Sequence, residues 1–197
     1  GRFSSYAISN YSNITKVTIA DLNEANAKEF SNHFDDRFTG IGLDVTNKEH
    51  LEKVMSDHDI VLNTTGPFFK FGLPILKSAI KCKCHYFDIC DDWEPTEEML
   101  KLNDEALKND ITAIVGLGAS PGISNLLGLK AMNELDETES IITGWDVSSA
   151  KPEDESSQKG TNAAMEHGLQ QISGEIKVYK DKKYKLTKPL EKIKIHY

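Results

Sequence analysis

The chain has 197 residues, of which 39% are hydrophobic and 27% charged, and its net charge at pH 7 is −8. This composition is typical of a globular protein with one good core and room for the start of a second unit. The negative charge argues against nucleic acid and anionic membranes as partners, because both bind basic patches. No apolar run approaches the roughly 20 residues that span a bilayer, and no signal peptide opens the sequence.

Helical and strand patterns alternate along the first 135 residues. After a helical pattern over residues 1–10, the predicted strands are 16–21, 38–44, 59–63, 85–90 and 111–116. The predicted helices are 24–32, 48–57, 73–81, 97–109 and 124–135, with Asn23 and Thr96 as N-caps. Apolar strands joined by helices are typical of a parallel sheet with right-handed crossovers. The predicted fold class is therefore α/β, a doubly wound parallel sheet.

The pattern changes from residue 139. A strand over residues 141–148, a polar loop, a helix over 163–172 and a β-hairpin over 175–187 predict an α+β unit. We therefore expect one domain over residues 1–138 and the start of a second over 139–197.

The sequence looks truncated at both ends. Gly1 stands directly before a helical pattern, and residues 193–197 alternate like a strand without a terminator. We expect a fragment whose first strand is missing, and an apolar strand ending in Gly-x before Gly1 in the complete chain.

Three cysteines, Cys82, Cys84 and Cys90, lie in one short segment. An odd number so close together is no disulfide framework and predicts a reducing, cytoplasmic location. Together with His85 they are similar in residue type to a metal site. Their spacing along the sequence differs from that of the paired cysteines in zinc sites, so no metal is predicted.

The first candidate site combines Gly1, Ser4 and Asp21. A carboxylate about 20 residues after a glycine turn, at the end of the next strand, holds the adenosine ribose in dinucleotide-binding folds. If Gly-x precedes Gly1, Ser4 faces the pyrophosphate at a helix N-terminus. An acid here repels a ribose phosphate, so NAD is favoured over NADP. A strand-terminal aspartate that merely caps is the alternative.

Polar residues also follow the next two strands. Asp44 and Val45 could flank the adenine, although Asp44 as a simple helix cap is an equal alternative. The third strand is followed by Asn63, Thr64, Thr65, Gly66 and Pro67. Because ligands lie across the carboxyl ends of strands in doubly wound sheets, these residues would stand at the mouth of the site. An ordinary strand end with a tight turn would have the same sequence.

Two later segments carry further candidates. Residues 88–94 hold four acids and Cys90, and carboxylates so close raise one another's pKa, which suits proton transfer. The alternative is a solvated loop in which Cys90 packs as a small apolar residue. Residues 116–125 form a glycine-rich loop between a buried strand and a helix N-terminus, where an anion or a polarised carbonyl could bind.

Two other patterns are set aside. Tyr179 and Lys183 have the spacing of a catalytic Tyr-x-x-x-Lys pair, which needs a helix, but both fall in the predicted hairpin. His167 could contact a substrate from the late helix, although a partly buried structural histidine is the more frequent case.

Three segments in order resemble the saccharopine dehydrogenase family. They are Asn63-Thr-Thr-Gly-Pro-Phe-Phe-Lys-Phe-Gly-Leu-Pro74, His85-Tyr-Phe-Asp-Ile-Cys-Asp-Asp-Trp-Glu-Pro95 and Gly116-Leu-Gly-Ala-Ser-Pro-Gly-Ile-Ser-Asn125. Residues 166–174 also look like that family's second domain. The resemblance implies a Rossmann-like domain that binds NAD(P) and an α+β domain that encloses the substrate and often dimerises. It implies hydride transfer at the C–N bond of a secondary amine or imine of an amino-acid-derived substrate.

The resemblance also implies site residues. The nicotinamide is placed beside Gly66-Pro67 and the loop of Ser120 and Pro121, with Asp88 among the cofactor contacts. Cys90 or Asp91 is placed closest to the reacting centre. Several members carry Asp-Pro-Gly where this chain has Ser120-Pro-Gly122, so no particular substrate is assigned. A non-catalytic, dinucleotide-binding regulatory protein of the same fold is the alternative.

Overall fold

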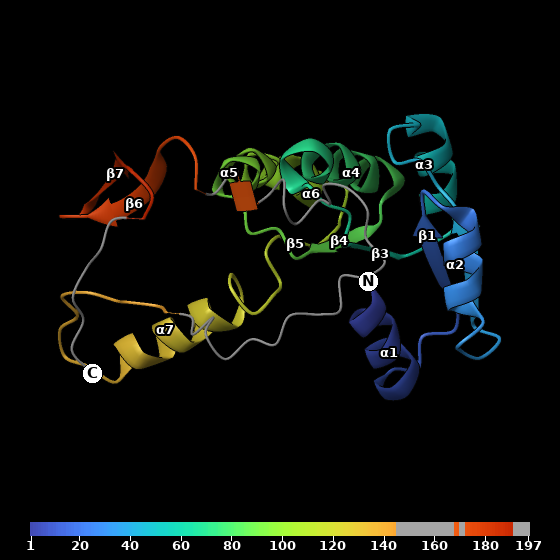
Figure 1. Ribbon diagram of the computed structural model, residues 1–197, viewed down its shortest axis with the longest axis horizontal. Helices are drawn as coiled ribbons and strands as arrows, with labels where there is room; N and C mark the ends of the chain where they lie inside the picture. The colour runs from blue at the N-terminus through green and yellow to red at the C-terminus, as the bar shows by residue number, and fades with distance from the viewer. Residues whose placement is uncertain (145–167, 170–171, 191–197) are drawn as a thin grey trace. The chain divides into compact units, whose positions relative to one another are not determined.

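The computed structural model describes residues 1–144, 168–169 and 172–190 (Figure 1). Its chain divides into two compact units, Gly1–Gly122 and Ile123–Tyr197. The predicted boundary at residue 138 differs from this division only in the placement of helix α7 (Ile123–Asn133) and the residues after it.

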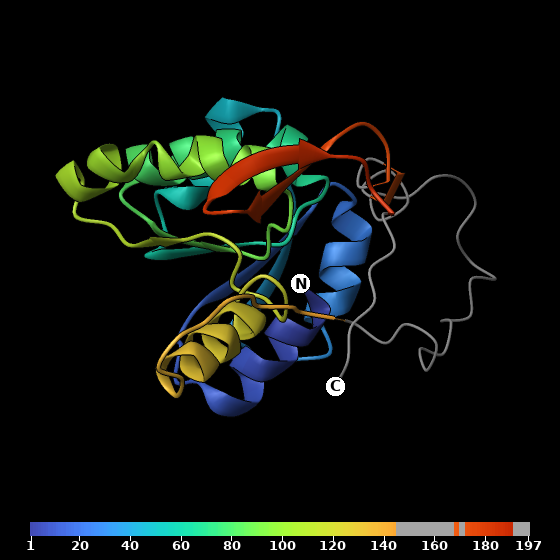
Figure 2. The ribbon, with the colours of Figure 1, turned by 90° about the vertical axis from the view of Figure 1, so that its left-hand side faces the viewer.

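The first unit alternates helices and strands. Its strands are β1 (Val17–Asp21), β2 (Phe38–Gly42), β3 (Ile60–Asn63), β4 (His85–Asp88) and β5 (Ala113–Ile114). Its helices are α1 (Arg2–Tyr11), α2 (Glu24–Ser31), α3 (Lys48–Met55), α4 (Phe68–Cys82), α5 (Trp93–Leu100) and α6 (Asn103–Lys108). The pairs β1–β2, β3–β4 and β4–β5 are parallel. Helices α4 to α6 lie above the strands and α1 below them (Figures 1 and 2), which confirms the α/β, doubly wound class.

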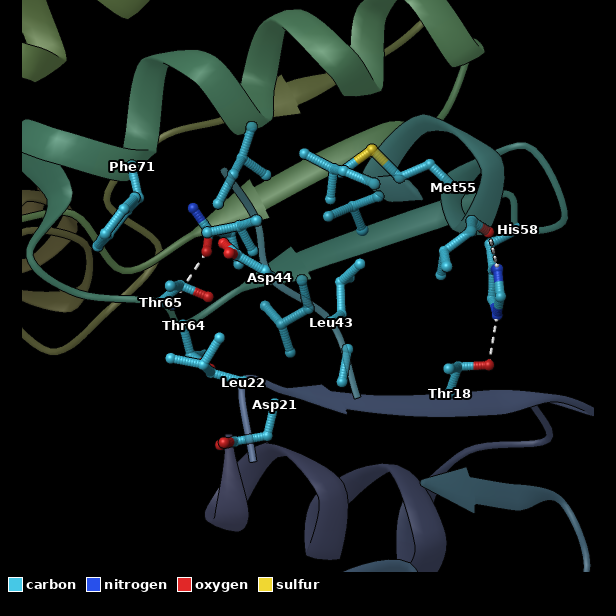
Figure 3. Close-up of a pocket in the computed structure, with 18 of the residues that line it drawn as sticks. Thr18, Asp21, Leu22, Leu43, Asp44, Met55, His58, Thr64, Thr65 and Phe71 are labelled. Carbon is cyan, nitrogen blue, oxygen red and sulfur yellow. Dashed lines mark hydrogen bonds between the residues drawn. The ribbon is translucent and has the colours of Figure 1, made fainter. Parts of the chain in front are cut away.

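The strands of this unit form two separate sheets, β1–β2 and β3–β4–β5. A hydrogen bond of 2.7 Å between Thr18 Oγ1 and His58 Nε2 links the start of β1 to the start of β3 (Figure 3). In the doubly wound order 3-2-1-4-5-6, one further strand lies at this place and completes a single sheet. The apolar strand expected before Gly1 stays a prediction; among the described residues, β1 pairs with β2 alone and β3 with β4 alone.

Strand β3 departs from its prediction. Its apolar sequence is typical of a parallel strand buried on both faces, but Ile60 is 50% and Leu62 is 40% exposed. The reason is that β3 pairs with β4 alone among the described residues, so its other edge and the side chains beside it are uncovered.

The core lies where α4 packs on β3 and β4, with α3 and α5 packed against α4. On α4 the buried positions recur with the helical period; they are Phe68, Gly72, Ile75, Leu76, Ser78, Ala79 and Ile80. This apolar face starts five residues before the predicted helix start, so Pro74 lies inside α4 rather than near its beginning. Burial of the face outweighs the hydrogen bond that a proline inside a helix cannot donate.

Of the two predicted N-caps, one is confirmed and one is wrong. Asn23 is the N-cap of α2, with its side chain accepting from Asn26 N at 3.2 Å, as predicted. The cap assigned to Thr96 is wrong, because α5 begins at Trp93, four residues before the predicted start, and its N-cap is Asp92. Thr96 instead donates its hydroxyl to the Asp92 carbonyl at 2.7 Å from inside the first turn.

The second unit contains α7 and a hairpin of antiparallel strands, β6 (Ile176–Lys180) and β7 (Lys183–Thr187). The hairpin was predicted, and it places Tyr179 and Lys183 on strands, which confirms that they form no helical pair. His167 and most of the expected helix over 163–172 lie outside the described residues. Of the expected strand over 141–148, residues 141–144 are described and form no strand, and the other half lies outside the described residues. Among the helices that the structure describes, none combines the length and apolarity needed to cross a membrane.

Candidate functional site

A cavity of about 720 Å³ opens where β1, β2 and β3 end (Figure 3). Because parallel strands end at the same edge of a sheet, residues far apart in the sequence meet on its rim. Seven predicted site residues line it: Asp21, Asp44, Val45, Asn63, Thr64, Thr65 and Gly66. On the rim, Asp21, Asp44, Thr64 and Thr65 lie near one another at the strand ends, while Thr18 and His58 lie at the other end of the cavity. Apolar side chains such as Leu43 and Met55 also line the cavity. The rim is the candidate ligand site, because the rest of the cavity lies between β1 and β3, whose facing edges are unpaired among the described residues.

Asp21 lies exposed at the end of β1. Its Oδ1 accepts the backbone N–H of Asn23 at 2.8 Å, which holds the carboxylate over the start of α2. An open depression continues from there, lined by Asp21, Asn23, Glu24 and Lys28 among others. Lys28 is the one cation of that lining, and its Nζ lies 2.5 Å from Glu24 Oε1. Two acids and one base therefore surround the depression.

Asp44 follows β2 and closes a turn with Thr46. Its Oδ1 accepts from the Thr46 hydroxyl at 2.6 Å and from the Thr46 backbone N–H at 2.8 Å. These two hydrogen bonds lower the pKa of Asp44, which keeps it ionised at neutral pH. The alternative that Asp44 caps α3 is wrong, because Asn47 is the N-cap and accepts from His50 N.

Gly1 and Ser4 line a neighbouring cavity of about 560 Å³, to which Thr64 also contributes. A Cβ added to Gly1 would lie 3.2 Å from Thr64 Oγ1, so the N-terminal end of α1 closely approaches the end of β3. Helix N-termini attract anions through their unpaired N–H groups and the helix dipole. Gly1 and Ser4 thus lie beside Thr64, whereas Asp21, which the sequence grouped with them, lines the larger cavity instead.

The end of β4 is buried. Asp88 has no exposed surface, and its Oδ1 accepts from Cys90 N at 3.0 Å and from Gly116 N at 2.8 Å. Cys90 is also fully buried, and burial raises the pKa of its thiol to about 11, so it is a neutral thiol at pH 7. Neither residue lines the two cavities described above. Their assigned contacts with cofactor and reacting centre stay predictions, and their burial favours packing and positioning.

The glycine-rich loop after β5 is anchored to the same strand end. Leu117 N donates to the Asp88 carbonyl at 2.7 Å, and Gly118 N donates to the Pro121 carbonyl at 3.0 Å. Ser120 is exposed at the tip of this loop, and Asp91 is exposed after β4. Four predicted residues, Pro67, Asp91, Ser120 and Pro121, line neither of the two cavities.

Sequence reasoning missed Tyr86, which lies next to Asp88 on the same face of β4. Its hydroxyl donates to Asp88 Oδ2 at 2.8 Å and accepts from Asn63 Nδ2 at 2.9 Å. The period-two alternation of His85-Tyr-Phe-Asp88 carries the signal, since residues two apart on a strand share a face.

The cysteines are not arranged around a metal. Cys84 Sγ lies 3.2 Å from the Met55 carbonyl and 3.1 Å from the His58 carbonyl, which it can reach as a weak donor. In the described part of the chain, no three His, Cys, Asp or Glu side chains are placed to hold a metal ion together.

Comparisons with known proteins agree with this geometry. A family model described as "Saccharopine dehydrogenase NADP binding domain" matches residues 1–114. The saccharopine dehydrogenases [NADP(+), L-glutamate-forming] of Saccharomyces cerevisiae and Schizosaccharomyces pombe are 30% and 27% identical over 119 residues, 60% of this chain and 25% of each relative. A solved structure of apo histidine-tagged saccharopine dehydrogenase (L-Glu forming) from Saccharomyces cerevisiae matches with a TM-score of 0.55 and 27% identity.

That structural match covers 66% of this chain and 27% of the solved chain. The chain thus spans about a quarter of the length of these relatives. The family description and the relatives' names specify NADP, so the predicted preference for NAD finds no support.

Proposed function

Because the chain belongs to the saccharopine dehydrogenase NADP binding domain family, we propose that it is the dinucleotide-binding part of an NADP-dependent oxidoreductase. The convergence of strand ends on one rim carries this proposal. Asp21, Asp44 and Thr64 come from three different strand ends, and the N-terminus of α1 approaches the same edge. Polar groups in this arrangement fit a ligand that is long, polar and anionic at its centre.

Each part of the rim has a separate binding task. Asp21 would accept hydrogen bonds from the adenosine ribose, and Asp44 with Val45 would flank the adenine. Gly1, Ser4 and the start of α1 would face the pyrophosphate. Thr65 and Gly66, with Pro67 beside them, would border the nicotinamide, which supplies or accepts a hydride when bound.

We propose that the reaction transfers hydride at the C–N bond of a secondary amine or imine of an amino-acid-derived substrate. The family membership supports this class, while Ser120 at the loop tip leaves the individual substrate open. We further propose a homodimer in a reducing, cytoplasmic compartment. The free thiols of Cys82, Cys84 and Cys90 support the second point, and sedimentation of the full-length protein tests the first.

Lys28 is our candidate for the group that accepts the ribose phosphate of NADP. Its pair with Glu24 is exposed, with 61% and 59% of the two side chains accessible. Such an exposed pair is worth little, so Lys28 can turn towards a phosphate at small cost. The lysine would then offset the repulsion between Asp21 and the added negative charge.

Calorimetric titration with NADPH and NADH tests this part of the proposal. Asp21→Ala should weaken binding of both dinucleotides several-fold. Lys28→Ala should weaken NADPH several-fold and leave NADH unchanged, while the control Lys53→Ala, in the last turn of α3, should change neither. An equal loss of both dinucleotides in Lys28→Ala removes its phosphate role. Failure of the unaltered protein to bind either dinucleotide removes the proposed function.

A non-catalytic, dinucleotide-binding protein is the second candidate. The complete burial of the Cys90 thiol favours it, because that thiol has no access to a substrate. Nicotinamide absorbance of the full-length protein, measured with NADPH, a panel of amino acids and carbonyl partners, separates the two. Binding without turnover of any pair would support the second candidate.

A further inference from the structure

A chain of buried hydrogen bonds leads from the cavity rim into the sheet. It begins where Thr65 N, on the rim, donates to Asn63 Oδ1 at 2.9 Å. Asn63 Nδ2 donates to the Tyr86 hydroxyl at 2.9 Å, and that hydroxyl donates to Asp88 Oδ2 at 2.8 Å. Asn63 is 3% exposed, and Tyr86 and Asp88 are not exposed at all. Solvent therefore does not compete for the two bonds at the Tyr86 hydroxyl, while the bond from Thr65 is partly buried.

The same chain continues on the far side of Asp88. The other carboxylate oxygen accepts the backbone N–H groups of Cys90 and Gly116, and the Asp88 carbonyl accepts from Leu117 N. Gly116 has φ of +77°, and an added Cβ there would lie 2.7 Å from Pro121 Cγ, so the loop start is tightly packed. One continuous path therefore connects the rim at Thr65 with the loop that carries Ser120.

The strand register explains why these side chains meet. Asn63 of β3 is the partner of Asp88 of β4, and Val61 is the partner of Tyr86. Residues two apart on a strand share a face, so Tyr86 lies on the same face as Asp88 and its ring reaches along the strand to both polar groups.

The donors and acceptors fix one another's direction. The Tyr86 hydroxyl has one proton, which it donates to Asp88, so it can only accept from Asn63. The Asn63 amide nitrogen is thereby turned to Tyr86, which leaves its oxygen for Thr65 N. Burial, followed by the charge of Asp88, raises the pKa of Tyr86, so the hydroxyl remains a donor throughout the neutral range. None of the three side chains can exchange its donor and acceptor roles unless the others do so too.

We propose that Tyr86 is a positioning residue, whose hydroxyl holds the rim at Thr65 and the loop at Gly116 in one shared arrangement. A dinucleotide on the rim and a second substrate beside the Ser120 loop are then held at a fixed separation, which hydride transfer requires. This role rests on the proposed function, since it concerns two ligands of the same site.

Tyr86→Phe tests the proposal, because it removes the hydroxyl and keeps the ring. We expect amide hydrogen exchange at Thr65 and Gly116 to speed up about five-fold, and the dissociation constant for NADPH to rise about five-fold, as for one lost hydrogen bond. Met99→Ala, a buried cavity variant in α5, controls for general destabilisation. Tyr11→Phe, at an exposed position, controls for the chemical change. In both controls these local values should stay unchanged.

The results distinguish failure of the positioning role of Tyr86 from failure of the proposed function. Suppose that Tyr86→Phe and Met99→Ala lower the melting temperature alike, and that the amide exchange rates of Thr65 and Gly116 are the same in both variants. Tyr86 is then merely structural, and the proposal is overturned. If the unaltered protein binds no NADPH, the proposed function fails, and the exchange rates still decide whether the linkage exists. Faster exchange at both ends in Tyr86→Phe alone supports the linkage.

Discussion

Gly40 marks the place where α2 lies directly on β2. A Cβ added to Gly40 would lie under 3.0 Å from the carbonyl group of Ala27 and from Lys28 N. These are main-chain atoms of α2, so no side-chain rotation can relieve the overlap. Since carbon contacts are favourable at about 3.5 Å, α2 must move away from β2 by about 1 Å in Gly40→Ala.

The cost of that movement follows from what α2 buries. Ala27 is 1% exposed and Ser31 7%, so a shift opens the interface between the helix and the β1–β2 sheet. Overpacking a core costs about 1–3 kcal/mol, and a clash between two main chains belongs at the upper end. A loss of about 3 kcal/mol is a large share of the roughly 5–15 kcal/mol that stabilises a domain.

Urea unfolding followed by circular dichroism measures this loss. With a typical slope of about 2 kcal/mol per molar urea, the midpoint of Gly40→Ala should fall by about 1.5 M. Dinucleotide binding should weaken as well, because the start of α2 lies beside Asp21.

Gly72→Ala is the matched control, since it makes the same chemical change inside α4. Its Cβ would lie 3.4 Å from Met99 Cε and Sδ, which is an ordinary contact. A helical glycine costs about 1 kcal/mol relative to alanine, so this variant should be as stable as the unaltered protein or more so. An unchanged midpoint in Gly40→Ala, or a larger loss in Gly72→Ala, would show that the packing of α2 on β2 is wrongly described.

Two further predictions concern local groups. Asn23→Ala should lower the unfolding free energy by about 1 kcal/mol, because it removes the N-cap of α2, and an unchanged urea midpoint would contradict that role. Burial raises the pKa of Cys90 from 9.0 to about 11, so the unfolded state loses its thiol proton first as pH rises. Stability should therefore be unaffected by this thiol below pH 9 and fall between about pH 9 and 11, relative to Cys90→Ala. Parallel midpoints for the two proteins across that range would refute the shift.

The sequence contained enough to predict most of the sheet and much of the rim. Apolar strands, turn residues and the cap at Asn23 are local signals, and they placed β1 to β4 within about two residues. The rule that strand ends meet at one edge then brought Asp21, Asp44 and Thr64 together without any knowledge of contacts.

Other features depend on contacts between distant segments. Pro74 suggested a helix start, but the apolar face of α4 packs against α5 and extends the helix backwards past the proline. The acids after β4 suggested a charged, reactive cluster, yet Asp88 turns inward to Tyr86 and the backbone of Gly116. The pattern of polar residues does not tell whether a carboxylate faces solvent or buried donors, since one donor, the backbone N–H of Gly116, comes from a segment 28 residues away in the chain.

Contacts from neighbouring elements fix two sides of the cavity rim. Its β3 side is fixed from β4, through the bonds that lead from Thr65 and Asn63 to Tyr86. Its α1 side is fixed from the segment before β2, because Arg37 donates to the Ser9 carbonyl at 3.1 Å and to the Ile14 carbonyl at 3.0 Å. Neither anchor comes from a strand between β1 and β3. The β3 and α1 sides of the rim therefore depend on β4 and on the α2–β2 connection, and substitutions there should alter binding without touching the ligand.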